Sequence, residues 1–207
     1  LSTSCSGAVA AVALRPCAVV AVRATPSSST SNGDHLADAR GGDCLADARG
    51  LTLPDGFTIA SAPADGAEAI ACLGAYYAEL AERFDEGFDV SATTSSDASE
   101  LTPPHGQLLL VRLHGVAVGV GAVKLLEDRS RAEVKRMWLR PSVRGRGIAT
   151  VLLARLEARA GQLGATTVVL DTRALLGVVA FYEAKGYARC APFNANPYPD
   201  WWGRKQL

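Results

Sequence analysis

The chain has 207 residues, of which 48% are hydrophobic and 20% charged, and its 21 Lys and Arg residues balance 21 Asp and Glu residues. This composition is typical of a globular protein, and the zero net charge gives no reason to expect nucleic acid or an anionic membrane as a partner. We also predict no membrane span, since no apolar run approaches the roughly 20 residues required, and no metal site, since the His and Cys residues lack ligand spacing.

Residues 1–50 differ in composition from the rest of the chain. Before Asp34 they contain Arg15, Arg23 and many Ser, Thr, Ala and Val residues but no acid, which is typical of an organelle transit peptide. An extension without a targeting role, or a misplaced start, is the alternative. Residues 36–41 and 45–50 then repeat Leu-Ala-Asp-Ala-Arg-Gly, which is low complexity. We predict a disordered low-complexity extension over 1–50 and one domain over 51–207, cytoplasmic unless residues 1–33 target a plastid or another organelle.

The first part of the predicted domain contains a strand, a helix and a long loop. The strand, residues 57–61, follows the turn signal Pro-Asp-Gly at 54–56. The helix, residues 67–84, is predicted from apolar residues at three- and four-residue steps, namely Ile70, Leu73, Tyr77, Leu80 and Phe84. Residues 85–106 are polar and end in two prolines, so we predict a loop with at most one helical turn.

The second part of the domain alternates strands and helices. In chain order, we predict strands over 107–113, 116–126 and 131–139, a helix over 143–161, a strand over 166–171, a helix over 175–185, and short strands over 187–191 and 201–207. His114-Gly115 joins the first two strands as a hairpin, and Gly186 suits the end of the last helix. This order predicts an α/β fold, an α+β mixed sheet with helices on both faces.

The turn that follows the strand over 131–139 is the most informative segment. It reads Arg144-Gly-Arg-Gly-Ile-Ala149 and leads into a helix. The first turn of a helix has unpaired backbone N–H groups and a positive dipole end, and glycines let these amides approach an anion closely. The segment therefore predicts a pyrophosphate-binding turn, and a tight strand–helix turn with solvated arginines is the alternative.

This turn, preceded by E-V-K-R-M-W-L, resembles the acetyl-CoA motif R/Q-x-x-G-x-G/A of the GNAT superfamily of N-acetyltransferases, with Arg144, Gly147 and Ala149 at its positions. Downstream, residues 181–187, F-Y-E-A-K-G-Y, resemble the family segment Y-E-K-x-G-F/Y. The resemblance covers roughly residues 52–207. It implies the GNAT, or acyl-CoA N-acyltransferase, fold, with a strongly twisted sheet of about six to seven strands. Leu175 and Val178 depart from the Asn and Ala of many members, which implies fewer polar contacts to the cofactor.

The resemblance implies acetyl-CoA as a co-substrate, without a metal, bound where the strands over 131–139 and 166–171 splay apart. Its pantetheine is expected on the backbone of Met137, Trp138 and Leu139, where an N–H near Leu139 would also hold the oxyanion. Its pyrophosphate is expected on the backbone amides of Arg144, Gly145, Arg146, Gly147, Ile148 and Ala149.

The same resemblance implies two catalytic residues. Tyr182 takes the place of the tyrosine that protonates the departing thiolate, and the alternative is that it only packs between Phe181 and Tyr187. Glu133 is the candidate base, because an amine must be neutral to attack a thioester. The alternative is that Glu133 is structural and pairs with Lys135 or Arg131, its neighbours on the same strand face.

The acceptor is predicted only as a primary amine. Acidic residues of the first helix, the loop after it and the C-terminal segment could favour a cationic amine or could simply be solvated; they are Glu79, Glu82, Asp85, Glu86, Asp89 and Asp200. Two other functions are alternatives: a non-catalytic sensor that binds acetyl-CoA or CoA, and nucleic-acid binding through the seven basic residues between Arg129 and Arg146. Family members are often dimers, so the resemblance also suggests a homodimer.

Overall fold

The computed structural model describes residues 51–85, 87–92 and 98–207. The predictions made for residues 1–50 and for Glu86 therefore lie outside the described residues. None of the helices in the described ranges is long and apolar enough to cross a membrane.

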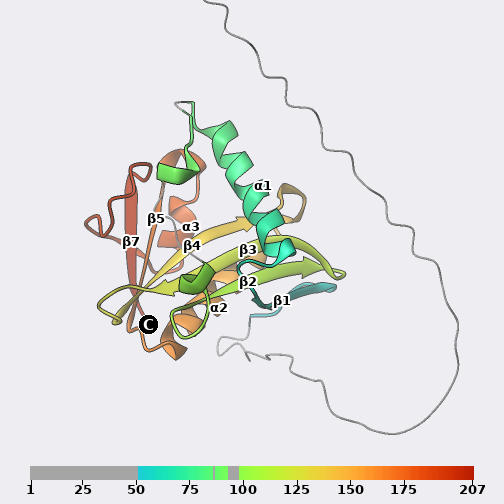
Figure 1. Ribbon diagram of the computed structural model, residues 1–207, viewed down its shortest axis with the longest axis horizontal. Coiled ribbons are helices and arrows are strands. Elements are labelled where there is room, and N and C mark those ends of the chain that lie inside the picture. The colour runs from blue at the N-terminus through green and yellow to red at the C-terminus, as the bar shows by residue number, and fades with distance from the viewer. Residues whose placement is uncertain (1–50, 86, 93–97) are drawn as a thin grey trace, which may run out of the picture. The chain divides into compact units, whose positions relative to one another are not determined.

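Seven strands form one mixed sheet, as predicted (Figure 1). They are β1 (Phe57–Ala62), β2 (Gly106–Leu113), β3 (Val116–Leu125), β4 (Arg131–Leu139), β5 (Thr167–Thr172), β6 (Ala188–Arg189) and β7 (Trp201–Gln206). The order across the sheet is β1-β2-β3-β4-β5-β7-β6, and all neighbours are antiparallel except β4 and β5. The long crossover through a helix between β4 and β5 explains why that pair is parallel.

Two helices cover opposite faces of the sheet (Figure 1). Helix α1 (Ala67–Arg83) packs over one face, where its Ala69 and Cys72 join a buried cluster with Leu108, Leu110 and other residues. Helix α2 (Ile148–Gln162) packs over the other face, where four of its leucine and valine residues join the larger core cluster. The apolar spacing read from both helices therefore matches the faces that they bury.

Two predicted helices have different bounds in the structure. Helix α2 begins at Ile148 and not at 143, because Gly145 and Gly147 have φ angles of +76° and +78°, outside the right-handed helical region. A short 3-10 turn, η3 (Pro141–Val143), precedes them. The helix predicted over 175–185 is also wrong: Gly177, at φ +71°, separates the 3-10 turn η4 (Ala174–Leu176) from the short helix α3 (Val179–Glu183).

Two smaller predictions also need correction. The strand predicted over 187–191 is only the two-residue β6. The loop predicted over 85–106 contains two 3-10 turns, η1 (Val90–Ala92) and η2 (Ala98–Leu101), and the second turn buries Leu101 in the core on the α1 side.

A β-bulge interrupts β4. Lys135 pairs with Ala122 and Trp138 pairs with Val120, so that Arg136 and Met137 both stand opposite Gly121. Arg136 has a φ of +57°, a left-handed conformation that is uncommon outside glycine. The extra residue reverses the faces of the strand: Val134 packs on the α2 side, whereas Trp138, four residues on, packs on the α1 side.

Strands β4 and β5 separate beyond their first three pairs. Only Arg131, Ala132 and Glu133 of β4 pair with β5, and from Val134 onward the β5-facing edge of β4 has no strand partner. The ends of two parallel strands therefore diverge at one edge of the sheet, which opens space between them.

Candidate active site

A large cavity lies along the end of β4, beyond the last residue that pairs with β5. It has a volume of about 520 Å³ and is bordered by α1, the end of β4, the start of α2, and α3. Nine of the eleven residues predicted for the site line it, namely Met137, Trp138, Leu139, Arg144, Gly145, Gly147, Ile148, Ala149 and Tyr182. Arg146 is exposed and does not line it, and Glu133 lines a neighbouring cavity.

The start of α2 presents unpaired backbone donors at this cavity. Within the described parts of the chain, no acceptor receives a hydrogen bond from the amides of residues 145–149, whereas the amides of Thr150 and Val151 bond to the carbonyl of Gly147. A β-carbon added to Gly145 or Gly147 would meet nothing within 4 Å, so the backbone there is open. Free amides at the positive end of a helix suit a phosphate or pyrophosphate group.

Arg144 is fixed beside these amides by two contacts. Its Nε donates to the carbonyl of Leu139 at 2.8 Å, and its guanidinium pairs with Glu79 of α1. Glu79 also pairs with Arg83 at 2.7 Å and accepts a hydrogen bond from Trp138 Nε1 at 2.7 Å. The bond from Arg144, together with Trp138, holds the pKa of the Glu79 carboxyl below its usual value. Glu79 therefore holds Arg144 and Trp138 in place on the wall of this cavity, whereas the sequence analysis had considered it as a residue that could attract a cationic acceptor.

Tyr182 combines packing with a place on the cavity wall. Its ring stacks on Trp201 at 6.3 Å between centroids and meets Phe181 and Tyr187 edge-on. Burial, and to a smaller extent the charge of Asp171, raises the pKa of Tyr182 to about 12. A phenol that stays protonated at neutral pH can donate a proton, so the fixed ring and the acid role are compatible.

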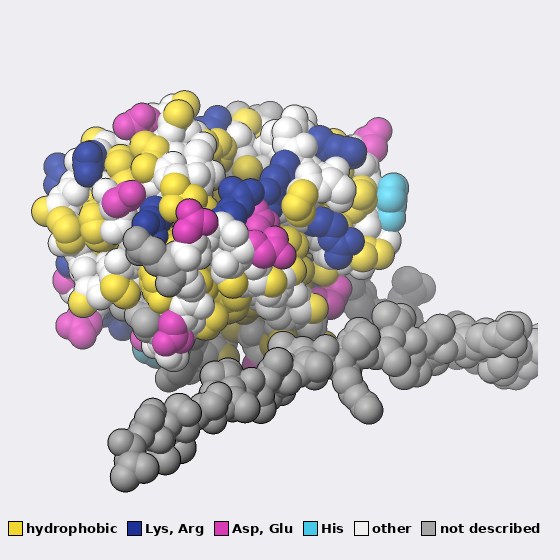
Figure 2. All heavy atoms as spheres, turned by 90° about the horizontal axis from the view of Figure 1, so that it is seen from above, with side chains coloured by type: hydrophobic (Ala, Val, Ile, Leu, Met, Phe, Trp, Pro, Cys, Tyr) yellow, Lys and Arg dark blue, Asp and Glu magenta, His cyan; other side chains and the backbone are white. Residues whose placement is uncertain are grey.

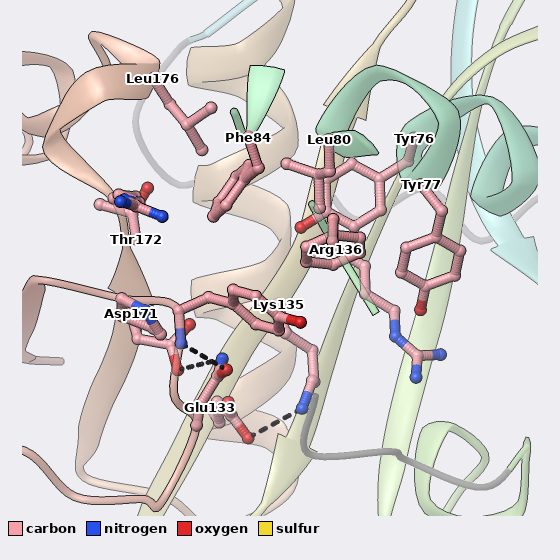
Figure 3. Close-up of a pocket in the computed structure, with 15 residues that line it drawn as sticks. Tyr76, Tyr77, Leu80, Phe84, Glu133, Lys135, Arg136, Asp171, Thr172 and Leu176 are labelled. Carbon is pink, nitrogen blue, oxygen red and sulfur yellow. Dashed lines mark hydrogen bonds and ion pairs between the residues drawn. The ribbon is translucent and has the colours of Figure 1, made fainter. Parts of the chain in front are cut away.

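A second, smaller cavity of about 100 Å³ adjoins the first. The two cavities share Tyr76, Leu80 and Leu176. In Figure 3, Tyr76 and Leu80 of α1, and Phe84 directly after it, extend toward Glu133 and Asp171 on the opposite side. The second cavity is therefore walled by aromatic and aliphatic side chains on one side and carries two carboxylates on the other.

Glu133 is buried and paired with a lysine. Its side chain is 4% exposed, and its Oε2 lies 3.3 Å from Lys135 Nζ. Burial raises the pKa of Glu133, although Lys135 opposes the shift, and burial lowers the pKa of Lys135. Arg131, the other partner considered, pairs instead with Asp128. A carboxyl group with a raised pKa that faces a cavity is a candidate base. Glu133 also forms the ion pair with Lys135, so the two roles considered for it are compatible.

Sequence reasoning missed the second carboxylate of this cavity. Asp171 is the last but one residue of β5 and lines the same cavity as Glu133, and its Oδ2 accepts hydrogen bonds from the side-chain amides of Asn194 at 2.7 Å and Asn196 at 3.2 Å. The available signal was its position, because ligands of α/β sheets bind at the carboxyl ends of parallel strands that separate. Of the acids suggested for the acceptor, Glu82, Asp85, Asp89 and Asp200 are exposed and do not line this cavity.

The charges at the surface are mixed. On the face drawn in Figure 2, Lys and Arg side chains lie beside Asp and Glu side chains and do not merge into one basic patch. In the described ranges, no group of three or more His, Cys, Asp and Glu side chains is placed to hold a metal ion.

The sequence matches the model of a family described as the acetyltransferase (GNAT) family over residues 70–187. An uncharacterized N-acetyltransferase of Schizosaccharomyces pombe is 35% identical over 100 residues, which cover 47% of this chain and 61% of that protein. An IAA acetyltransferase of Azospirillum brasilense is 35% identical over 106 residues, covering 50% of this chain and 68% of that protein.

A solved structure supports the same relationship over a longer stretch. A Klebsiella pneumoniae protein described as an acyl-CoA N-acyltransferase is 32% identical, with a TM-score of 0.59, and the match covers 73% of this chain and 97% of that chain. The chain spans 61% and 68% of the lengths of the two curated relatives, whereas it covers nearly all of this structure.

Proposed function

The chain belongs to the acetyltransferase (GNAT) family, and on that premise we propose that it transfers the acetyl group of acetyl-CoA directly to a primary amine. Membership of this family implies an acyltransferase that uses an acyl-CoA as its donor. We propose in addition that the donor is acetyl-CoA, that the acceptor is an amine, and that individual residues have the roles given below. The observation that carries it is the run of amides at residues 145–149, which have no acceptor among the described residues, at the edge of a cavity that continues to Tyr182.

The described residues suit the parts of acetyl-CoA. The amides of residues 145–149 would hold the pyrophosphate, with Arg144 beside them, and the free edge of β4 at Met137–Leu139 would hold the pantetheine. Acetyl-CoA supplies an acetyl group activated as a thioester. A backbone N–H near Leu139 would stabilise negative charge on the carbonyl oxygen during the transfer.

Glu133 and Tyr182 move the protons in this proposal. Glu133 takes the proton that the amine must lose as its nitrogen bonds to the acetyl carbon. Tyr182 gives its proton to the sulfur as the carbon–sulfur bond breaks. The two side chains line adjoining cavities that meet at Tyr76, Leu80 and Leu176, so the acceptor and the thioester can approach from the two sides.

The first test is thermal stability with saturating acetyl-CoA, with CoA and ATP measured beside it. We expect a rise in Tm of several degrees with acetyl-CoA and none with ATP, because a ligand held only by the folded state stabilises it by about 2.7 kcal/mol at one hundred times its Kd. Thiol release is then followed with a panel of amines. No Tm shift at saturating acetyl-CoA would contradict the proposal, and a shift without transfer to any amine would favour a sensor.

Replacing Glu133 with glutamine tests its role as the base through pH. We expect kcat to fall about 10²-fold at neutral pH, the lower end for general base catalysis. The deficit should shrink as pH rises toward the pKa of the amine, because the acceptor then arrives without its proton. The measurement is the kcat profile of Glu133→Gln against the parent chain between pH 6 and 10.

A purely structural role for Glu133 predicts a loss of kcat that does not depend on pH. Loss of the pair with the buried Lys135 would lower Tm and reduce kcat by the same factor at every pH. Lys135→Met with the parent Glu133 retained serves as the control for the pair, since it removes the ion pair but leaves the base. A pH-independent deficit shared by both variants would remove the base role.

A further inference from the structure

Among the described residues, the carboxylate of Asp171, which lines the smaller cavity, has no cationic partner. Its two hydrogen-bond donors are the side-chain amides of Asn194 and Asn196, which are neutral. No Lys, Arg or His side chain in the described ranges lies within ion-pair distance of it. The amides fix the carboxylate in place and leave its charge uncompensated, which is costly in a half-buried site unless a cation arrives.

The other charges of this cavity are disposed differently. The carboxylate of Glu133 is already paired with Lys135. The guanidinium of Arg136 lies toward Tyr77 and points away from Asp171 in Figure 3. That of Arg173 lies over the ring of Phe84, 4.8 Å from its centroid. Asp171 is therefore the carboxylate of the cavity that is open to a positively charged ligand.

Aromatic rings from two distant segments surround the same cavity. Tyr76 and Tyr77 of α1, Phe84 and Phe88 after it, and Tyr198 of the C-terminal segment all line it. Tyr198 holds them together, because its ring lies 5.5 Å from Phe84 and 4.8 Å from Phe88 and its hydroxyl bonds to the backbone of Asp89. Aromatic faces attract organic cations and pack against methylene groups.

We propose that Asp171 binds the acceptor as an ammonium ion and that the aromatic rings around it select a primary amine carried on an apolar carbon chain. This inference rests on the proposed function for the transfer itself, but the binding of the cation does not depend on it. Asp171 is thus a residue of the protein that determines specificity for the acceptor, and it is distinct from the base, Glu133. Once seated, the ammonium lies next to Glu133, which can take its proton.

The first experiment measures acceptor affinity with butylamine. We expect Asp171→Asn to raise the KM for butylamine about 10- to 100-fold, the effect of losing a charge-assisted hydrogen bond. The KM for acetyl-CoA should not change. Asp55→Asn, which removes one negative charge from an exposed turn, is the matched control and should leave both values as they are. An unchanged KM for butylamine in Asp171→Asn would overturn the proposal.

A second experiment measures binding without transfer. N,N-dimethylbutylamine is a cation at neutral pH but cannot be acetylated to a stable amide, and 1-butanol is its uncharged comparator. We expect calorimetric titration of the parent chain to show saturable binding of the amine but not of the alcohol, and we expect that binding to be lost in Asp171→Asn. Equal binding to parent and variant would contradict the role of Asp171.

These two readouts separate the inference from the proposed function. Binding of N,N-dimethylbutylamine that depends on Asp171, without transfer to butylamine, would support the cation site and count against the acetyltransferase proposal. Transfer to butylamine with the same KM in the parent chain and in Asp171→Asn would support the acetyltransferase proposal and contradict the cation site.

Discussion

Replacing Gly147 with aspartate is expected to abolish the binding of acetyl-CoA. Gly147 precedes α2 at a φ of +78°, and the amides around it have no acceptor in the described residues. A β-carbon there meets open space, so the new carboxylate has room beside the amides that would receive the pyrophosphate. It would place a like charge in the anion site and occupy its donors. The measurement is the Tm shift produced by saturating acetyl-CoA, which should disappear.

Gly147→Ala is the matched control for this prediction. It carries the same penalty for a left-handed backbone, about 1–2 kcal/mol, but no charge. We therefore expect both variants to melt at similar, lowered temperatures without ligand, and the alanine variant alone to keep most of its response to acetyl-CoA. A full response in the aspartate variant would show that the pyrophosphate binds elsewhere.

Replacing Tyr182 with phenylalanine is expected to lower kcat by about 10²-fold or more while the affinity for acetyl-CoA stays nearly unchanged. The ring that stacks on Trp201 is retained, so the change removes only the hydroxyl. Because burial, together with the charge of Asp171, raises the pKa of Tyr182 to about 12, the phenol keeps its proton over the range in which amines titrate. The deficit should therefore be the same from pH 6 to pH 10.

Tyr187→Phe provides the comparison. Tyr187 belongs to the same aromatic group, 5.8 Å from Tyr182 between ring centroids, but lines neither cavity. We expect it to retain most of the parent kcat. Equal kcat in Tyr182→Phe and the parent chain, measured by thiol release at saturating amine, would remove the acid role of Tyr182.

The sequence predicted the sheet and the glycine turn before α2 because both depend on local signals. Alternating apolar residues indicate strands, and glycines before a helix indicate a turn with positive φ angles, which Gly145 and Gly147 have. Gly177 carries the same signal, but the helix predicted over 175–185 ran through it to Gly186. The structure breaks the helix there, which leaves only five residues in α3.

The parts of the site that the sequence did not predict depend on distant contacts. Arg136 is an ordinary strand residue by type, and its left-handed conformation arises from the unequal pairing of β3 and β4. Asp171 is held in place by Asn194 and Asn196, which lie more than 20 residues away in the sequence. The acidic residues of α1 and the loop after it were linked to a cationic acceptor by their composition alone. One of them, Glu79, instead pairs with Arg83 and with Arg144, which lies 65 residues away in the sequence.

The narrow overlap between the two cavities has a consequence for evolution. Among the described residues, only Tyr76, Leu80 and Leu176 border both, whereas the other aromatic rings of the smaller cavity lie on α1 and the segment after it, or on the C-terminal segment that Tyr198 ties to it. If the smaller cavity holds the acceptor, as proposed, substitutions in those segments would change the preferred amine and leave the residues around the larger cavity untouched. On that proposal, new acceptors could arise by single substitutions, and each variant would still bind the same acyl donor.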